Sequence, residues 1–163
     1  MHTSIAERLA FGTPLDPVAD DTPIHLVPRA GTALIARILM SAIFLTSGIA
    51  KLVDPAGAQG YMNMAGIPHA DILVYVAGFA ELLGGLALLL GFLTRIGALG
   101  LFIFLIPTTL AFHGFWNMEG AEAKTQMVNF MKNLAIMGGL LAIYAWGPGR
   151  YSVDARIRRP IQP

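Results

Sequence analysis

Four apolar segments, each close to the length that crosses a bilayer, constrain the fold of this chain more than any other feature. A transmembrane helix needs about 20 mainly apolar residues, and the segments lie at 32–52, 72–93, 96–112 and 128–146. Only 13% of the 163 residues are charged, whereas soluble domains carry about 25%. The middle two segments are separated only by a short turn at 94–95, which forces an antiparallel hairpin. The sequence therefore predicts an all-α protein, an antiparallel bundle of four transmembrane helices.

The remaining residues divide into flanking segments and two long connections. Residues 1–30 are polar and contain four prolines, which disfavour regular helix, so we expect a cytoplasmic arm ahead of a membrane domain at 31–150. A basic cytoplasmic tail is expected at 151–163. The connections at 54–71 and 114–126 predict short interfacial helices that cap the bundle, with a docking surface as the alternative.

The distribution of basic residues predicts the orientation. With four spans, the N-terminus, the middle turn and the C-terminus share one side of the membrane, and that side collects all eight arginines: Arg8, Arg29, Arg37, Arg95, Arg150, Arg156, Arg158 and Arg159. The opposite side holds only Lys51, Lys124 and Lys132, together with four acidic residues. Basic residues concentrate on the cytoplasmic side of membrane proteins. Both termini are therefore predicted to be cytoplasmic in a bacterial inner membrane.

Glu81 is the only acidic side chain well inside one of the apolar segments. Such a group costs about 2.5–3.5 kcal/mol to insert, so it usually faces a partner or a water-filled cavity. Gly78, Gly84 and Gly85 lie three or four residues away on the same side of the helix, where a second helix can approach closely. The pattern fits either a functional site or a structural contact between two helices, and both interpretations remain open.

Polar groups from all four segments are expected at a similar depth in the outer half of the bundle. The candidates are Lys51, Glu81, His113, Lys132 and Asn133. A lysine close to Glu81 would hold the carboxylate ionised, and a histidine nearby can donate or accept a hydrogen bond near neutral pH. Such a pocket suits a quinone headgroup or another small polar molecule. The alternative is that the two lysines and the histidine simply extend to water at the interface.

Arg37 is a separate basic residue, about five positions into the first apolar segment. Long cationic side chains near a membrane surface commonly extend toward the lipid headgroups. We therefore expect Arg37 to reach lipid phosphates, rather than to serve a function of its own.

Several classes of cofactor and partner are disfavoured by composition. The chain contains no cysteine, which excludes disulfides and cysteine-ligated zinc or iron–sulfur clusters. A haem held by two intramembrane histidines is not expected, because His113 is the only histidine at the edge of a span. No metal-ligand spacing is present, and no basic patch with aromatic residues indicates nucleic-acid binding. We expect no covalently bound cofactor and no metal.

Four stretches of the sequence together resemble the DoxX family of small four-helix bacterial membrane proteins. They are SGIAKL at 47–52, GFAELLGGLALLLGFLTRIGAL at 78–99, KNLAIMGGLL at 132–141 and GPGRYSVD at 147–154. They follow the order and spacing of the family over most of residues 35–155. The resemblance implies the four-helix architecture, and the N-terminal arm is longer than expected for the family.

The resemblance also implies a setting for function. Relatives are associated with membrane redox systems, including the small subunit of a thiosulfate:quinone oxidoreductase and complexes that handle oxidative stress. Recurring lysine, glutamate and lysine–asparagine positions of the family map onto Lys51, Glu81, Lys132 and Asn133. These implications concern the family, and function does not follow from a shared fold alone.

Three functions remain in competition at this stage. The first is a membrane subunit of a redox-linked complex, with a quinone or similar molecule in the polar pocket. The second is a non-catalytic accessory or assembly subunit, since a chain without cysteine or paired haem ligands has no means of carrying electrons by itself. The third is a transporter of a small solute, which a homo-oligomer could form. All three place the protein among membrane lipids and with other subunits or further copies of itself.

Overall fold

The computed structural model describes residues 29–157 and is all-helical over most of that range. Its elements are α2 (Arg29–Val53), α3 (Ala56–Met64), α4 (Ala70–Leu90), α5 (Thr94–Phe112), α6 (Gly120–Trp146) and α7 (Val153–Ile157). Helices α2, α4, α5 and α6 are each long and apolar enough to cross a membrane. The predicted all-α architecture with four spanning helices is confirmed. The predicted cytoplasmic arm lies almost wholly outside the described residues, as does the end of the basic tail.

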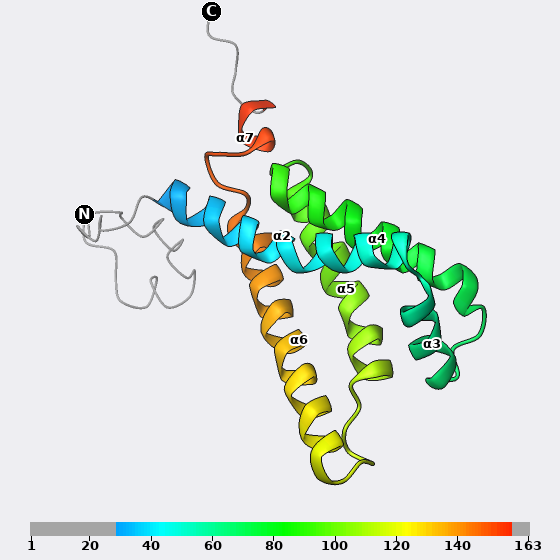
Figure 1. Ribbon diagram of the computed structural model, residues 1–163. Helices are drawn as coiled ribbons and strands as arrows, with labels where there is room; N and C mark the ends of the chain where they lie inside the picture. Colours follow the sequence, from blue (N-terminus) through cyan, green and yellow to red (C-terminus); the bar gives the residue numbers. More distant parts are fainter. Residues whose placement is uncertain (1–28, 158–163) are drawn as a thin grey trace, which may run out of the picture.

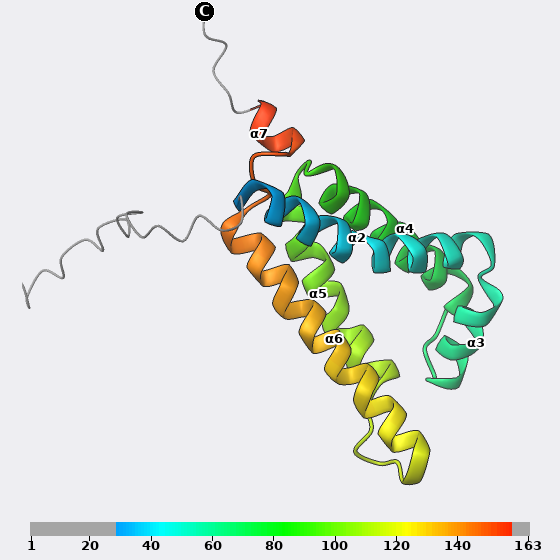
Figure 2. The same cartoon turned by 60° about the vertical axis from the view of Figure 1, so that its left-hand side comes forward.

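The four long helices form two antiparallel pairs, α2 with α4 and α5 with α6 (Figures 1 and 2). The pairs lie close together at the end that holds the start of α2, the α4–α5 turn and α7, called here the closed end. They diverge toward the other end, called the open end, where α3 and the loop between α5 and α6 lie. A buried apolar cluster joins all four long helices: Phe44, Leu88, Ala98, Leu101, Leu105, Met137, Leu140 and Ile143. The arrangement leaves room between the pairs toward the open end.

Helices α2 and α4 cross at glycine residues. A Cβ at Gly48 of α2 would lie 2.8 Å from the backbone carbonyl oxygen of Gly78 and 2.8 Å from the backbone nitrogen of Leu82. On α4, Gly78 faces Leu52 and Gly85 faces Leu45. The absence of side chains at these positions lets the two backbones approach closely. The predicted role of the small residues around Glu81 agrees with this contact.

Arg37 does not reach toward lipid phosphates, so that expectation is wrong. Its side chain is buried between α2, the end of α4 and the segment after α6, with 1% of the residue exposed. The guanidinium donates hydrogen bonds to the backbone carbonyl of Leu88, at 3.4 Å, and to that of Tyr151. The guanidinium donates to backbone carbonyls at the ends of two segments. These carbonyls lie in the protein interior, where lipid headgroups cannot reach them. Arg37 is therefore a structural residue of the closed end.

Asp154 of α7 caps the start of α5. Its carboxylate accepts hydrogen bonds from the backbone amides of Leu93, at 2.9 Å, and Thr94, at 3.1 Å, and from the Thr94 hydroxyl, at 2.9 Å. The amide of Asp154 in turn donates to the carbonyl of Gly91, at 2.9 Å. Gly91 and Leu93 both have positive φ, 68° and 49°, and a non-glycine residue in that region is strained. The segment after α6 thus folds back and holds the α4–α5 turn.

Replacement of Asp154 by alanine tests this contact. We expect Asp154→Ala to lower the free energy of unfolding by about 0.5–2 kcal/mol, the range for loss of a helix cap. The measurement is unfolding of the purified protein in mixed micelles by increasing SDS. Asp54→Ala, which removes an exposed acidic side chain after α2, is the matched control. Equal stability of the two variants would contradict the capping role.

The two connections at the open end differ from each other. The first contains the predicted short helix, α3, whose Met62 is buried with Val74 and Ala77 of α4. In the second, the helix begins earlier than expected, because α6 starts at Gly120 rather than near residue 128. Because the first turns of α6 are polar, the apolar pattern of the sequence predicted a span that begins only near residue 128. At about 1.5 Å per residue, this helix of 27 residues exceeds the roughly 30 Å of a bilayer core.

Candidate functional site

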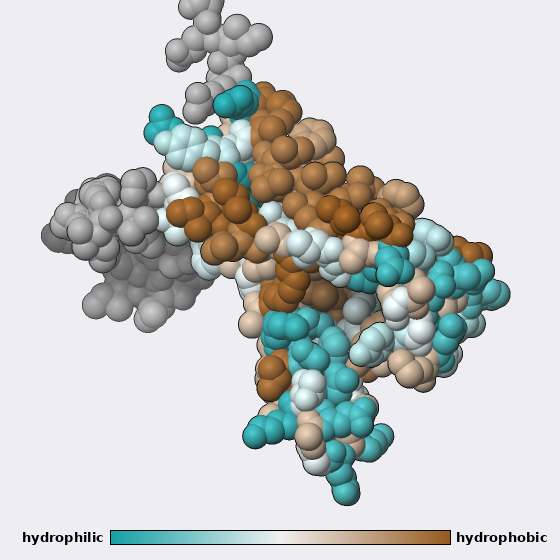
Figure 3. All heavy atoms as spheres, viewed as in Figure 1, coloured by the Kyte–Doolittle hydropathy of each residue, from teal (hydrophilic) through white to brown (hydrophobic). Residues whose placement is uncertain are grey.

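A cavity of about 310 Å³ lies between the two helix pairs, toward the open end. Side chains from α2, α3, α4, α5 and α6 line it, together with His113 directly after α5. Figure 3 shows the hollow between the apolar surface over α2 and α4 and the more polar surface over α3 and the start of α6. Apolar groups make up most of the lining, including Phe44, Met62, Leu105 and Phe112. The cavity exists because the two helix pairs diverge toward the open end. The buried apolar cluster that includes Phe44 closes the cavity on the side of the closed end.

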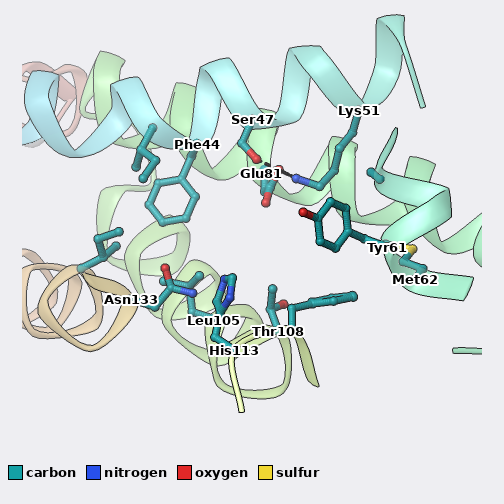
Figure 4. A pocket seen from close by; sticks show the side chains of 14 residues that line it. Phe44, Ser47, Lys51, Tyr61, Met62, Glu81, Leu105, Thr108, His113 and Asn133 are labelled. Atoms are coloured by element: carbon teal, nitrogen blue, oxygen red, sulfur yellow. Dashed lines mark hydrogen bonds and ion pairs between the residues drawn. The ribbon is translucent and has the colours of Figure 1, made fainter. Parts of the chain in front are cut away.

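Lys51 and Glu81 form an ion pair on one wall of the cavity (Figure 4). The Lys51 Nζ lies 2.8 Å from Glu81 Oε2 and also donates to the Ser47 hydroxyl at 2.6 Å. The side chain of Glu81 is 7% exposed and that of Lys51 is 19% exposed. The close approach of α2 and α4 at Gly48 places the two groups opposite each other. Of the two predicted lysines, Lys51 is the partner of Glu81.

His113 lies on the opposite side of the cavity, at the C-terminal end of α5. Its Nδ1 is 2.9 Å from Oε1 of Gln126, a residue of the second turn of α6. In Figure 4 the ring stands in the cavity near Asn133 and Thr108, with the Lys51–Glu81 pair across from it. The early start of α6 is what brings Gln126 to this histidine.

Asn133 joins α6 to α5 at the base of the cavity. It is 8% exposed, and its amide donates a hydrogen bond of 3.1 Å to the hydroxyl of Thr109. Thr108, the next residue along α5, also lines the cavity and donates to the carbonyl of Phe104 at 2.8 Å. Asn133 thus fixes the position of α6 while presenting polar atoms to the cavity.

Lys132 is not part of this site. Its ammonium group is exposed and donates to Oδ1 of Asn129 at 3.1 Å, on the outer face of α6. Adjacent residues on a helix point about 100° apart, so when Asn133 faces inward Lys132 cannot. Four of the five candidate residues therefore line one cavity, and the fifth faces away from it. Within residues 29–157, no cluster of three or more histidine, aspartate or glutamate side chains could hold a metal ion.

Comparisons with known proteins identify the family. The DoxX family model matches residues 32–114, about half of the chain. The chain belongs to the DoxX family. The matched range runs from α2 to the residue after His113, so it contains three of the four candidate residues that line the cavity.

The relatives of this DoxX protein are membrane proteins. It is 40% identical over 126 residues to the inner membrane protein YqjF of Escherichia coli, covering 77% of this chain and 92% of YqjF. It is 33% identical to the inner membrane protein YphA of the same organism, covering 76% and 88% of the two chains. A membrane protein of Mycobacterium tuberculosis, Rv3486, is 31% identical, with 76% and 79% covered. No solved structure matches the chain significantly.

Two further residues of the DoxX cavity were not singled out from the sequence. Tyr61 of α3 is 63% exposed and stands at the mouth of the cavity, with its hydroxyl pointing inward in Figure 4. Thr108 contributes a hydroxyl from α5. The signal for Tyr61 was available in the spacing of Ala58, Tyr61 and Met62, which lie on one face of a helix at i, i+3 and i+4. No comparable pattern marks Thr108.

Proposed function

We propose that this DoxX protein is a membrane subunit of a redox-linked complex and that its cavity binds the headgroup of a quinone or a similar small, amphipathic molecule. The observation that carries the proposal is the Lys51–Glu81 ion pair set in the wall of a mainly apolar cavity. Ligand sites are typically apolar with a few convergent polar groups and occupy about 300–1,000 Å³. At about 310 Å³, this cavity has room for a single ring headgroup.

The chemistry of the polar groups supports a ligand with two oxygen functions. Lys51 offers hydrogen-bond donors on one side, and His113 and Asn133 offer polar nitrogen and oxygen atoms on the other. An apolar lining between them suits a flat ring, and the open side between the helix pairs allows an apolar tail to extend into lipid. Tyr61 at the mouth can donate or accept as the headgroup passes.

The distribution of charge supports the orientation predicted from the sequence. Arg95, Arg150 and Arg156 belong to the closed end, whereas Glu119 and Glu122 belong to the open end. Under the positive-inside rule the closed end is cytoplasmic, and the cavity lies in the outer half of a bacterial inner membrane. A ligand would then exchange with the outer leaflet.

Electron transfer requires a partner in this proposal. A chain without cysteine holds no thiolate-ligated cluster, so a second subunit would carry electrons to or from the quinone. The accessory role is the alternative, in which the same complex forms but no ligand enters the cavity.

The test uses the full chain purified from native membranes in mild detergent, with Glu81→Gln and Glu122→Gln compared with the wild type. Mass spectrometry of the lipid extract is expected to find quinone with the wild type and with Glu122→Gln, which alters an exposed carboxylate on α6. In Glu81→Gln the Lys51 ammonium is no longer held by the carboxylate, so it leaves the position from which it donates to the ligand. We therefore expect quinone occupancy to fall about 10- to 100-fold, the effect of losing a charged hydrogen-bond donor.

The proteins that co-purify distinguish the candidates. Oxidoreductase subunits together with quinone would support the proposal, and such subunits without quinone would favour the accessory role. A homo-oligomer with neither would contradict both and favour transport. Circular dichroism and size-exclusion chromatography check that Glu81→Gln remains folded.

A further inference from the structure

We propose that His113 presents a hydrogen-bond acceptor to the cavity and that the cavity is therefore selective for the reduced, hydroxyl-bearing form of the headgroup, a quinol. This inference rests on the proposed function and adds the redox form of the ligand to it. It also assigns a positioning role to Gln126, a residue outside the cavity lining.

The contact between His113 and Gln126 sets which ring nitrogen carries the hydrogen. The amide oxygen Oε1 of Gln126 can only accept, and it lies 2.9 Å from Nδ1 of His113. Nδ1 must therefore donate. A neutral imidazole has a single N–H, so Nε2 carries a lone pair. Because the ring lines the cavity, this lone pair is the acceptor that His113 offers there. Gln126 is positioned for this contact by the second turn of α6.

The α5 side of the lining presents acceptors to a ligand that can donate. The remaining N–H of Asn133 and the hydroxyl hydrogens of Ser47 and Tyr61 are donors that either redox form can use, so they do not set the preference. Thr108 uses its hydroxyl hydrogen for the carbonyl of Phe104, at 2.8 Å, so its oxygen is left to accept. With His113, this gives two acceptors on the α5 side of the cavity. On the α2 side, Lys51 has three hydrogens, of which Ser47 and Glu81 take two. A quinol can donate from one hydroxyl toward α5 and accept at the other oxygen from Lys51, whereas a quinone can only accept.

The experiment compares the two redox forms of one ligand. Decyl-benzoquinone and its quinol, the latter under argon, are titrated into the full chain in nanodiscs, and binding is followed by calorimetry. For the wild type we expect the quinol to bind about 3- to 10-fold more tightly, the effect of one additional neutral hydrogen bond. Gln126→Lys replaces the acceptor by a donor, so His113 would accept at Nδ1 and donate from Nε2. The preference is then expected to shift toward the quinone.

Gln126→Leu and a direct observation of the ring complete the test. Gln126→Leu leaves the tautomer unspecified and is expected to abolish the selectivity while both forms still bind. Nitrogen-15 spectra of histidine-labelled protein, assigned by comparison with His113→Phe, are expected to show hydrogen on Nδ1 of His113 in the wild type and not in Gln126→Lys. A purely structural role for Gln126 would change neither the tautomer nor the ratio of the two affinities.

The outcomes separate this inference from the function on which it rests. Equal affinity for the two forms, a preference for the quinone, or hydrogen on Nε2 in the wild type would overturn the inference and leave quinone binding intact. Failure of both forms to bind the wild type would overturn the proposed function and the inference together.

Discussion

Substitution of Lys51 by methionine is expected to lower the free energy of unfolding by about 3–5 kcal/mol, the range for removing one partner of a buried ion pair. Glu81 has 7% of its side chain exposed, and among residues 29–157 Lys51 is the cation that pairs with it. Without Lys51, the acid must either stay charged away from water or take up a proton, and each state costs free energy. Methionine keeps the length and the apolar stem of lysine, so packing changes little.

Replacement of the acid instead of the lysine, in Glu81→Gln, is expected to lower the free energy of unfolding by less than Lys51→Met does. Lys51 is 19% exposed and lies near the end of α2, so in Glu81→Gln its long side chain can extend toward water. In the double variant Lys51→Met/Glu81→Leu both charges are absent, and stability is expected to recover most of the loss. Lys132→Met is the matched control, since this lysine is exposed on α6 and bonds only Asn129 among the contacts described for it.

SDS titration of each variant in mixed micelles, followed by circular dichroism, provides the measurement. Lys51→Met as stable as Lys132→Met would show that the pair does not stabilise the fold. A double variant less stable than Lys51→Met would show that the loss arises from packing rather than from charge.

The sequence was sufficient to predict the long helices because their signal is apolar length. It also indicated the contact around Glu81, because an acid in an apolar helix needs a partner and glycines at i±3 and i+4 admit one. Which lysine serves as that partner could not be decided, since Lys51 and Lys132 were expected at similar depth. The choice depends on the rotation of α6, which turns Asn133 toward Thr109 and packs Met137 and Leu140 into the core.

The role of Arg37 could not be predicted for a related reason. Its two terminal nitrogens donate to the carbonyls of Leu88 and Tyr151, 51 and 114 positions away in sequence. No local pattern reports such a contact, and an arginine near a membrane surface looks the same whether it turns outward or inward. The divergence of the helix pairs likewise depends on packing between segments distant in sequence. The sequence therefore predicted that polar groups from different helices converge, but it did not predict the shape of the cavity between the pairs.

Gly48→Ala is expected to produce the second large effect, although it adds a single methyl group. That methyl would lie 2.8 Å from backbone atoms of Gly78 and Leu82, and backbone in the middle of α4 cannot move aside as a flexible side chain could. Overpacking costs about 1–3 kcal/mol, and contact with rigid backbone places this site at the upper end of that range. The cost then exceeds the gain of roughly 1 kcal/mol from replacing glycine by alanine in a helix. Because the crossing places Lys51 against Glu81, ligand binding should weaken together with stability.

Gly138→Ala is the matched control for this substitution. Gly138 is in the interior of α6, and a Cβ built there meets no atom within 4 Å. Alanine at this position is expected to leave stability unchanged or to raise it slightly. The comparison by SDS titration therefore separates helix propensity from helix contact, two effects that a single glycine variant would mix. If Gly48→Ala proved as stable as Gly138→Ala, α2 and α4 would have to be further apart than the structure places them, and the ion pair between Lys51 and Glu81 would lose its geometric basis.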